Sequence, residues 1–203
     1  MTASAPPTAE RLTFAAMRLF SEKGYGSTSV ADILREADAN PGSLYHFFPT
    51  KQDLLLAVLE QYRDGIVPML LEPAWRGVDD PVERIFALLG VYRGLLEQSG
   101  CMYGCPIGSL ALELHEPDPP VRELLSVNFD GWSRHIRTCL DEVADRLPPG
   151  TDRMRLARFV LTTMEGGVMQ SRTHRNLEAF DDGVACLRDY LERLTDAAAT
   201  KKT

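Results

Sequence analysis

The sequence has few cysteines, no long apolar run and fewer cationic than acidic residues, and these shortages exclude several classes of protein. Four cysteines among 203 residues, none in a CxxC pair, do not make a disulfide scaffold and favour a reducing cytoplasm. The longest uncharged stretch, residues 98–112, is interrupted by three glycines and a proline, so we expect no membrane span. Residues 1–7 have neither a basic nor an apolar region, and we expect no secretory signal.

Helical periodicity dominates what is present, and alternating strand patterns are scarce. A hydrophobic fraction of 44% and a charged fraction of 25% are typical of a globular protein. We therefore predict an all-α fold of about nine helices, in which Pro68, Pro73 and Gly77 break the fourth. The expected helices cover residues 8–24, 29–37, 41–47, 50–66, 81–98, 109–114, 117–148, 151–172 and 177–197.

The second and third of these helices predict a helix-turn-helix. The chain passes from a helix at 29–37 through a tight turn into a short helix at 41–47, an arrangement that places the second helix in a DNA major groove. Ser29 and Asn40 are good N-caps for the two helices. Asp38, within the turn, tolerates a left-handed backbone better than most residues.

The same segment resembles the TetR family of bacterial transcriptional repressors. The residues that carry the resemblance are Phe20 to Tyr25, Thr28 to Ile33, and Gly42 to Leu55. Asp38 departs from the family pattern, where glycine is usual, and Asn40 replaces a more common Ser or Thr. The resemblance implies a DNA-binding domain at residues 1–50, and a ligand-binding and dimerisation domain at 51–203.

We expect nine residues to contact DNA through phosphates or base edges. Gly42 lets the backbone approach the sugar-phosphate chain, and Lys51 can hold a phosphate at the start of the next helix. Leu44 and Phe47 are expected to anchor the short helix on its protein side. The predicted DNA-binding residues are Arg11, Thr28, Ser29, Asn40, Gly42, Ser43, Tyr45, His46 and Lys51.

The net charge of -7 argues at first against a nucleic-acid binder, since phosphate contacts need Lys and Arg. Residues 1–53 hold five Lys and Arg against six Asp and Glu, so most of the acidity lies beyond the helix-turn-helix. The predicted partner is accordingly a double-stranded operator that a homodimer binds specifically and with a weak electrostatic contribution.

The C-terminal half resembles the LmrA/YxaF-like subgroup of the family more loosely. The matching positions are Gly104 to Gly108, Leu110 to Glu113, Phe129 with Trp132, and Glu165 to Gly167. The resemblance implies a pocket for a small-molecule inducer, which we expect to be apolar or aromatic, and a homodimer through the last two helices. Gly166 and Gly167 would allow close helix approach, either to a second subunit or within one chain.

A ligand pocket needs apolar walls and a few polar groups, although aromatic and Met residues at helical spacing are more often core. Phe86, Tyr92 and Met169 are further candidates for its walls. Our predicted ligand-binding residues are Tyr103, Cys105, Phe129, Trp132, His135, Met164 and Glu165.

Cys105 supports an alternative function, a small-molecule or redox sensor with weak or lost DNA binding. Pro106 at a first helical position would place Cys105 at an N-cap, where the helix dipole favours a thiolate. The alternative for this residue is a buried, inert thiol, and Arg172 stands where related sensors lead us to expect a lysine. We find no catalytic spacing, phosphate loop or convergent metal ligands around His115, and we predict neither an enzyme nor a cofactor.

Overall fold

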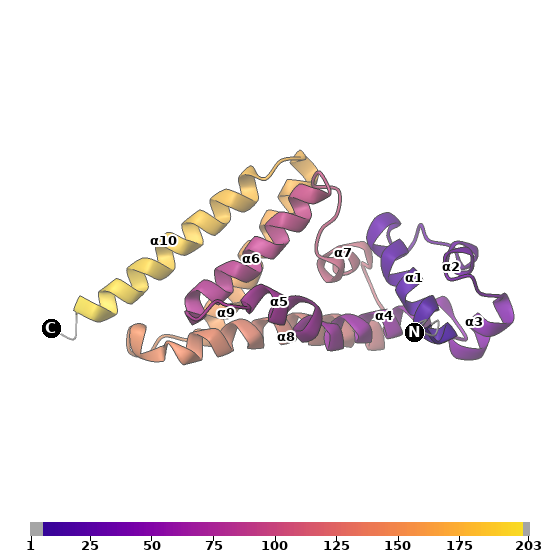
Figure 1. Ribbon diagram of the computed structural model, residues 1–203, viewed down its shortest axis with the longest axis horizontal. Coiled ribbons are helices and arrows are strands. Elements are labelled where there is room, and N and C mark those ends of the chain that lie inside the picture. The colour runs from indigo at the N-terminus through magenta and orange to yellow at the C-terminus, as the bar shows by residue number, and fades with distance from the viewer. Residues whose placement is uncertain (1–5, 201–203) are drawn as a thin grey trace. The chain divides into compact units, whose positions relative to one another are not determined.

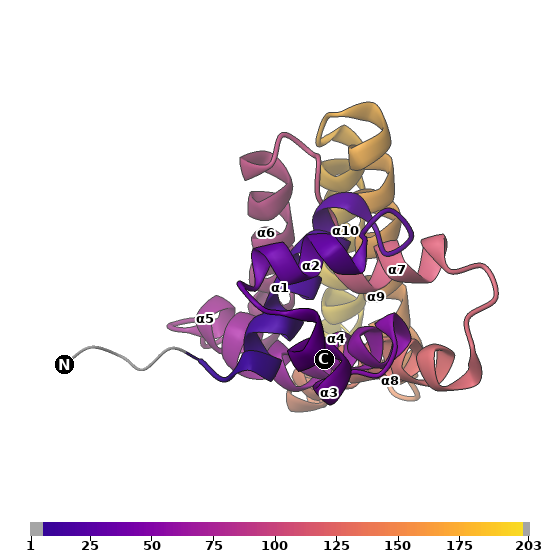
Figure 2. The same cartoon turned by 90° about the vertical axis from the view of Figure 1, so that its right-hand side faces the viewer.

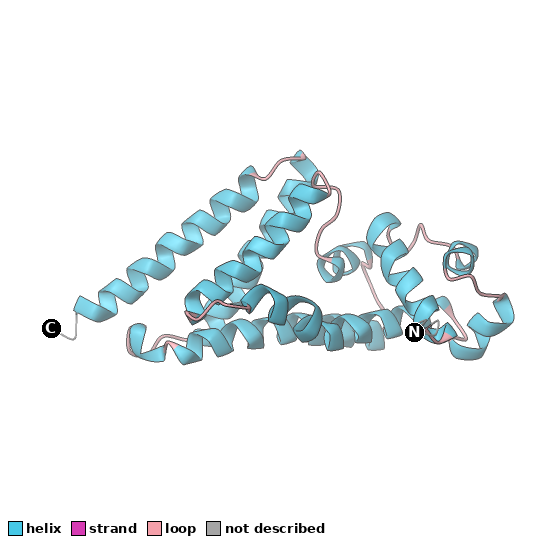
Figure 3. Ribbon diagram, in the orientation of Figure 1, coloured by secondary structure: helices cyan, strands magenta, loops and turns pink. Residues whose placement is uncertain are grey.

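The computed structural model describes residues 6–200, and among these the chain is helical with no strand (Figure 1, Figure 3). The predicted all-α fold is confirmed. The α-helices are α1 (Thr8–Lys23), α2 (Val30–Glu36), α3 (Pro41–Phe47), α4 (Lys51–Ile66), α5 (Glu72–Trp75), α6 (Pro81–Gln98), α7 (Pro106–Glu113), α8 (Pro119–Glu142), α9 (Arg153–His174) and α10 (Glu178–Thr200). A π-helical turn, η1, spans Val67–Leu71, and a 3₁₀ turn, η2, spans Ala144–Arg146.

The α-helix α4 ends at Ile66, as predicted, but the prolines that follow do not take the chain out of a helical path. The chain stays helical through a wide π turn, in which the Glu72 N–H donates to the Val67 carbonyl five residues back. Each proline lies in the first two positions of its own helical segment, where a missing N–H is tolerated. Gly77, with a φ of +76°, lies in the turn that follows.

The contacts of the chain form two compact units. The first contains residues 6–64 together with 106–128, and the second contains residues 65–105 together with 129–200. Helix α7 and the start of α8 thus belong with the N-terminal helices, which the periodicity of the sequence does not indicate. The predicted functional boundary at residue 50 stays a prediction.

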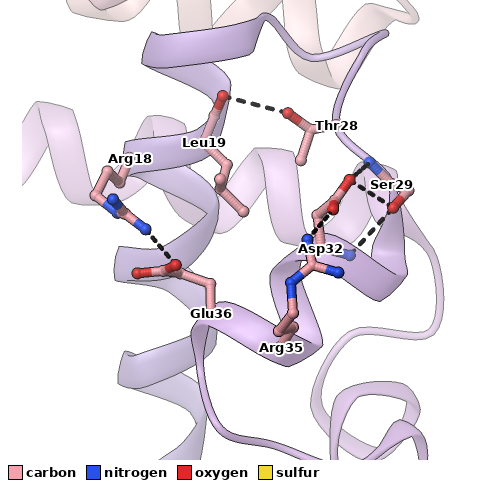
Figure 4. A network of polar contacts seen from close by, with 7 residues as sticks. All are labelled: Arg18, Leu19, Thr28, Ser29, Asp32, Arg35 and Glu36. Carbon is pink, nitrogen blue, oxygen red and sulfur yellow. Dashed lines mark hydrogen bonds and ion pairs between the residues drawn. The ribbon is translucent and has the colours of Figure 1, made fainter.

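In the first unit, local sequence signals set the ends of α2 and α3. The Ser29 hydroxyl accepts from the Asp32 N–H while the Asp32 carboxylate accepts from the Ser29 N–H, which completes a capping box (Figure 4). Asn40 caps α3 by accepting from the Ser43 N–H at 2.8 Å. Asp38 adopts a φ of +47°, so the left-handed turn expected there is present.

The second unit contains α6, α9 and α10, which lie side by side in two views (Figure 1, Figure 2). A Cβ on Gly167 would lie 3.0 Å from Phe180 Cα, so this glycine permits a close approach of α9 to α10 within one chain. A Cβ on Gly166 would meet nothing within 4 Å. Of the two alternatives for the glycine pair, close approach within one chain therefore holds for Gly167.

Ion pairs on the surface of the second unit join the same helices. The Arg93 guanidinium binds both carboxylate oxygens of Asp181, at 2.8 and 3.0 Å, and Arg188 binds Glu83 in the same bidentate manner. Such pairs are partly exposed and add little stability individually, but their geometry keeps α10 in register with α6.

Candidate nucleic-acid interface

Helix α3 exposes several large side chains to solvent. Leu44 is buried and anchors the helix, whereas Tyr45 is 54% exposed and His46 is also exposed. Phe47, expected to anchor α3, is 45% exposed and packs its ring against that of His46 at 4.8 Å. The expectation that Phe47 anchors the helix is wrong: Leu44 and Phe47 are three residues apart and share a helical face, but Phe47 is the last residue of α3 and stays about half exposed. The helix thus offers an aromatic and hydrogen-bonding surface.

The N-terminus of α3 carries three more of the predicted DNA-binding residues. Asn40 and Gly42 lie toward solvent, and Ser43 is half-buried. A Cβ on Gly42 would lie 3.2 Å from Asn40 Oδ1, so the glycine also leaves room for the cap. The glycine at this position therefore has a local structural cause, and its approach to DNA stays a prediction.

Thr28 requires a correction, whereas Ser29 stays exposed. Thr28 is 1% exposed, and its hydroxyl lies 2.7 Å from the Gly24 carbonyl oxygen. The same hydroxyl lies 3.2 Å from the Leu19 carbonyl oxygen (Figure 4). This side chain stabilises the turn after α1 and does not face solvent. Ser29 hydrogen-bonds to Asp32, which lowers the pKa of that carboxyl to about 2 and keeps a negative charge at the start of α2.

Arg11 is also placed differently from our expectation of a phosphate contact. Its guanidinium donates to the carbonyls of Ala37 and Asp38 at 3.1 and 3.2 Å. These carbonyls lie at the C-terminal end of α2, where a cation satisfies acceptors that have no intrahelical partner. Arg11 thus fastens the turn of the helix-turn-helix to α1.

Lys51, at the first position of α4, is half-buried against the turn between α1 and α2. Its ammonium donates a hydrogen bond to the Tyr25 carbonyl and lies 4.2 Å from the centroid of the Tyr25 ring. Burial lowers the pKa of Lys51, and the negative charge of Glu113 opposes that shift. In this structure the ammonium is thus engaged by the protein itself.

Sequence reasoning missed Glu113 as a member of this unit. Its carboxylate accepts from the N–H groups of Tyr25 and Gly26, at 2.8 and 2.6 Å. The glycines at 24 and 26 are a signal in the sequence, since both leave space beside Tyr25. Nothing in a helical pattern, however, connects that turn with a residue 88 positions later.

The predicted ligand residues do not surround an open cavity in the second unit. Trp132 and Met164 are buried with Tyr92 around an apolar cavity of about 10 Å³. Ligand pockets commonly measure several hundred Å³, so this space would have to open before a small molecule could enter. Tyr103 and Met169 are exposed, Phe129 is half-buried, and Phe86 is buried beneath the Arg188 guanidinium.

Cys105 and Glu165 form a buried polar pair in the same unit. The Cys105 side chain is 2% exposed and hydrogen-bonds to the Glu165 carboxyl, whose Oε1 has no hydrogen-bond partner in the described part of the chain. Burial raises the pKa of Glu165. His135 is half-buried, and its pKa is lowered by that burial and by Arg134. The thiol therefore lies in surroundings that do not expose it to reagents.

Two other classes of feature do not occur among the described residues. Over residues 6–200, no group of three or more His, Cys, Asp or Glu is placed to hold a metal ion. No helix in the same part of the chain is long and apolar enough to cross a membrane.

Helices α2 and α3 form a helix-turn-helix whose second helix, α3, is capped and exposed. Together with the second helical unit, this arrangement is that of a DNA-binding regulator of the helix-turn-helix class. Comparison with known proteins agrees. Residues 12–58 match the family of bacterial regulatory proteins of the tetR type, and residues 81–185 match the C-terminal domain of LmrA/YxaF-like transcriptional regulators. The chain belongs to the TetR family and is a transcriptional regulator of its LmrA/YxaF-like subgroup.

Individual relatives support the same family. An HTH-type transcriptional regulator of Mycobacterium tuberculosis is 32% identical over 178 residues, which cover 85% of this chain and 88% of the relative. The regulator LmrA of Bacillus subtilis is 28% identical, with 91% and 96% covered. The crystal structure of a TetR transcriptional regulator from Chloroflexus aurantiacus is 29% identical, with a TM-score of 0.78 and coverage of 91% and 94%.

Proposed function

We propose that the protein is a ligand-responsive repressor that binds a pseudo-palindromic operator as a homodimer and is released by a small-molecule inducer. The observation that carries this proposal is the exposed face of α3, where Tyr45 and His46 can meet base edges and phosphates. Residues 1–50 would read DNA, and residues 51–203 would bind the inducer and dimerise. Such a protein acts in the cytoplasm, where its operator is.

Homodimerisation is supported by exposed aromatic side chains on the last two helices. Phe159 of α9 and Tyr190 of α10 are 48% and 46% exposed and meet edge-to-face at 5.9 Å. They line an open groove of about 570 Å³ with Asp152, Arg155 and Leu194. Large apolar side chains gathered on a surface are typical of protein interfaces, and a second copy would cover them.

Induction is supported by the closed apolar cavity at Trp132 and Met164. An inducer of apolar or aromatic character would stabilise a conformer in which this cavity is open, and it can shift the equilibrium only by binding that conformer more tightly. The buried, unpartnered oxygen of Glu165 offers a polar anchor in the same unit.

The experiment is a selection from a random duplex library by the purified chain, followed by sedimentation of the complex with the enriched duplex. We expect a sequence with two inverted half-sites about one helical turn, or a small multiple, apart, and an even number of chains on each duplex. Enrichment of no sequence, or a complex with a single chain, would contradict the proposal.

A further inference from the structure

The carboxylate of Glu113, the last residue of α7, accepts two hydrogen bonds from the turn between α1 and α2. Tyr25 N–H donates to Oε2 at 2.8 Å, and Gly26 N–H donates to Oε1 at 2.6 Å. Both oxygens of one carboxylate are thus bound to adjacent backbone amides. Hydrogen bonds to an ionised acceptor are about twice as strong as neutral ones, so this is a directed contact and not a chance approach of a surface side chain.

The turn has the residues that this contact requires. A Cβ on Gly24 would lie 2.9 Å from Glu113 Oε2, and the φ of Gly24 is +86°. A Cβ on Gly26 would lie 3.1 Å from Glu113 Oε1. Side chains at these two positions would push the carboxylate away, so the two glycines and the glutamate fit one another.

Tyr25 connects this carboxylate to the start of α4. Its N–H is held by Glu113, its carbonyl accepts a hydrogen bond from the Lys51 ammonium, and its ring lies beneath that ammonium. The charge of Glu113 is felt at Lys51, whose pKa it raises against the lowering by burial. A displacement of Glu113 would therefore move the peptide that holds Lys51.

Glu113 and the turn to which it hydrogen-bonds match two different family domains. Tyr25, Gly26 and Lys51 fall within the DNA-binding match at residues 12–58, whereas Glu113 falls within the regulatory match at residues 81–185. All four nonetheless belong to one compact unit of the structure. The segment that matches the regulatory domain thus supplies a hydrogen-bond acceptor to backbone N–H groups of the segment that matches the DNA-binding domain.

We propose that Glu113 is a positioning residue for DNA binding. By holding the α1–α2 turn, and through Tyr25 the side chain of Lys51, it keeps the first turns of α2 and α4 in the arrangement that binds DNA. The inference rests on the proposed function, because it assumes that the chain binds a specific duplex.

The test compares Glu113→Gln with Glu116→Gln, which removes the same charge from a nearby exposed position. Both variants are titrated with the duplex that the parent protein selects from a random library, at several salt concentrations. We expect Glu113→Gln to bind roughly 3- to 10-fold more weakly, since it loses charge-assisted hydrogen bonds. The slope of log affinity against log salt should become shallower by at most about 1, the contribution of one phosphate held by Lys51, because a carboxylate itself neutralises no phosphate.

Two additional measurements separate positioning from a loss of folding. Amide hydrogen exchange at Tyr25 and Gly26 should accelerate in Glu113→Gln and not in Glu116→Gln, while the melting temperatures of the two variants stay close. Gly26→Ala adds a Cβ close to Glu113 Oε1 and should displace the carboxylate. This variant should therefore also weaken DNA binding, although Glu113 itself is unchanged.

Equal affinities and equal exchange in Glu113→Gln and Glu116→Gln would overturn the proposal. A weaker affinity with unchanged exchange at Tyr25 and Gly26 would also overturn it, since the turn would then not be the route. If the parent protein selects no duplex, the proposed function fails and the positioning role fails with it, while the exchange data still report whether the contact exists in solution.

Discussion

The ammonium of Lys51 lies 4.2 Å from the centroid of the Tyr25 ring and donates a hydrogen bond to the Tyr25 carbonyl. The lysine that the sequence suggests for a phosphate contact is therefore held by its own protein in the absence of DNA. For Lys51 to bind a phosphate, the ammonium must turn outward, or the phosphate must approach while the contact with Tyr25 persists.

Lys51→Met tests this role, because methionine retains much of the apolar stem and removes the charge. We expect weaker binding to every duplex, and the slope of log affinity against log salt should become shallower by about 1 for each phosphate that Lys51 neutralises in the parent complex. Fluorescence anisotropy at a series of salt concentrations measures both quantities. An unchanged slope would mean that Lys51 stays on Tyr25 and serves only the turn.

Tyr45→Ala should separate DNA binding from folding. The Tyr45 side chain is more than half exposed, so its removal should change the free energy of unfolding by less than about 0.5 kcal/mol while DNA affinity falls. Leu44→Ala, at the neighbouring buried position, should cost about 2–5 kcal/mol of stability. Urea titrations of both variants check this, and a destabilised Tyr45→Ala would contradict the exposed face of α3.

The glycine pair of α9 offers a matched comparison. Gly167→Ala places a Cβ 3.0 Å from the backbone of Phe180 and should destabilise the fold by about 1–3 kcal/mol. Gly166→Ala meets nothing within 4 Å and should stabilise the helix by about 0.5–1 kcal/mol. Thermal unfolding of the two variants is the measurement, and equal effects would show that α9 and α10 do not approach as described.

Thiol labelling tests the surroundings of Cys105. Cys101, Cys105 and Cys139 are buried, whereas Cys186 is exposed. In Cys186→Ser we expect no thiol of the folded protein to react with a disulfide reagent within minutes, and three to react after denaturation. A fast phase that disappears on adding Cys105→Ser would contradict a buried, inert Cys105 and revive the sensor hypothesis.

The features that were predictable from the sequence are those formed by residues close together in the chain. The caps at Ser29 and Asn40 and the left-handed Asp38 each depend on atoms within about three residues, so the residue types alone identify them. Helix periods likewise report which face is buried. These local signals, and the motif that they build, were enough to indicate the all-α fold and the family.

What only the tertiary structure decided are the partners of residues that are far apart in the chain. The burial of Thr28, the contact of Arg11 with the end of α2 and the closed cavity at Trp132 depend on how helices pack. The grip of Glu113 on Tyr25 joins positions 88 residues apart. Helical periodicity indicates which side of a helix is apolar but not which other helix it contacts. In the same way, the sequence shows that cationic residues are few, but only the packing of the helices decides which groups Arg11 and Lys51 contact.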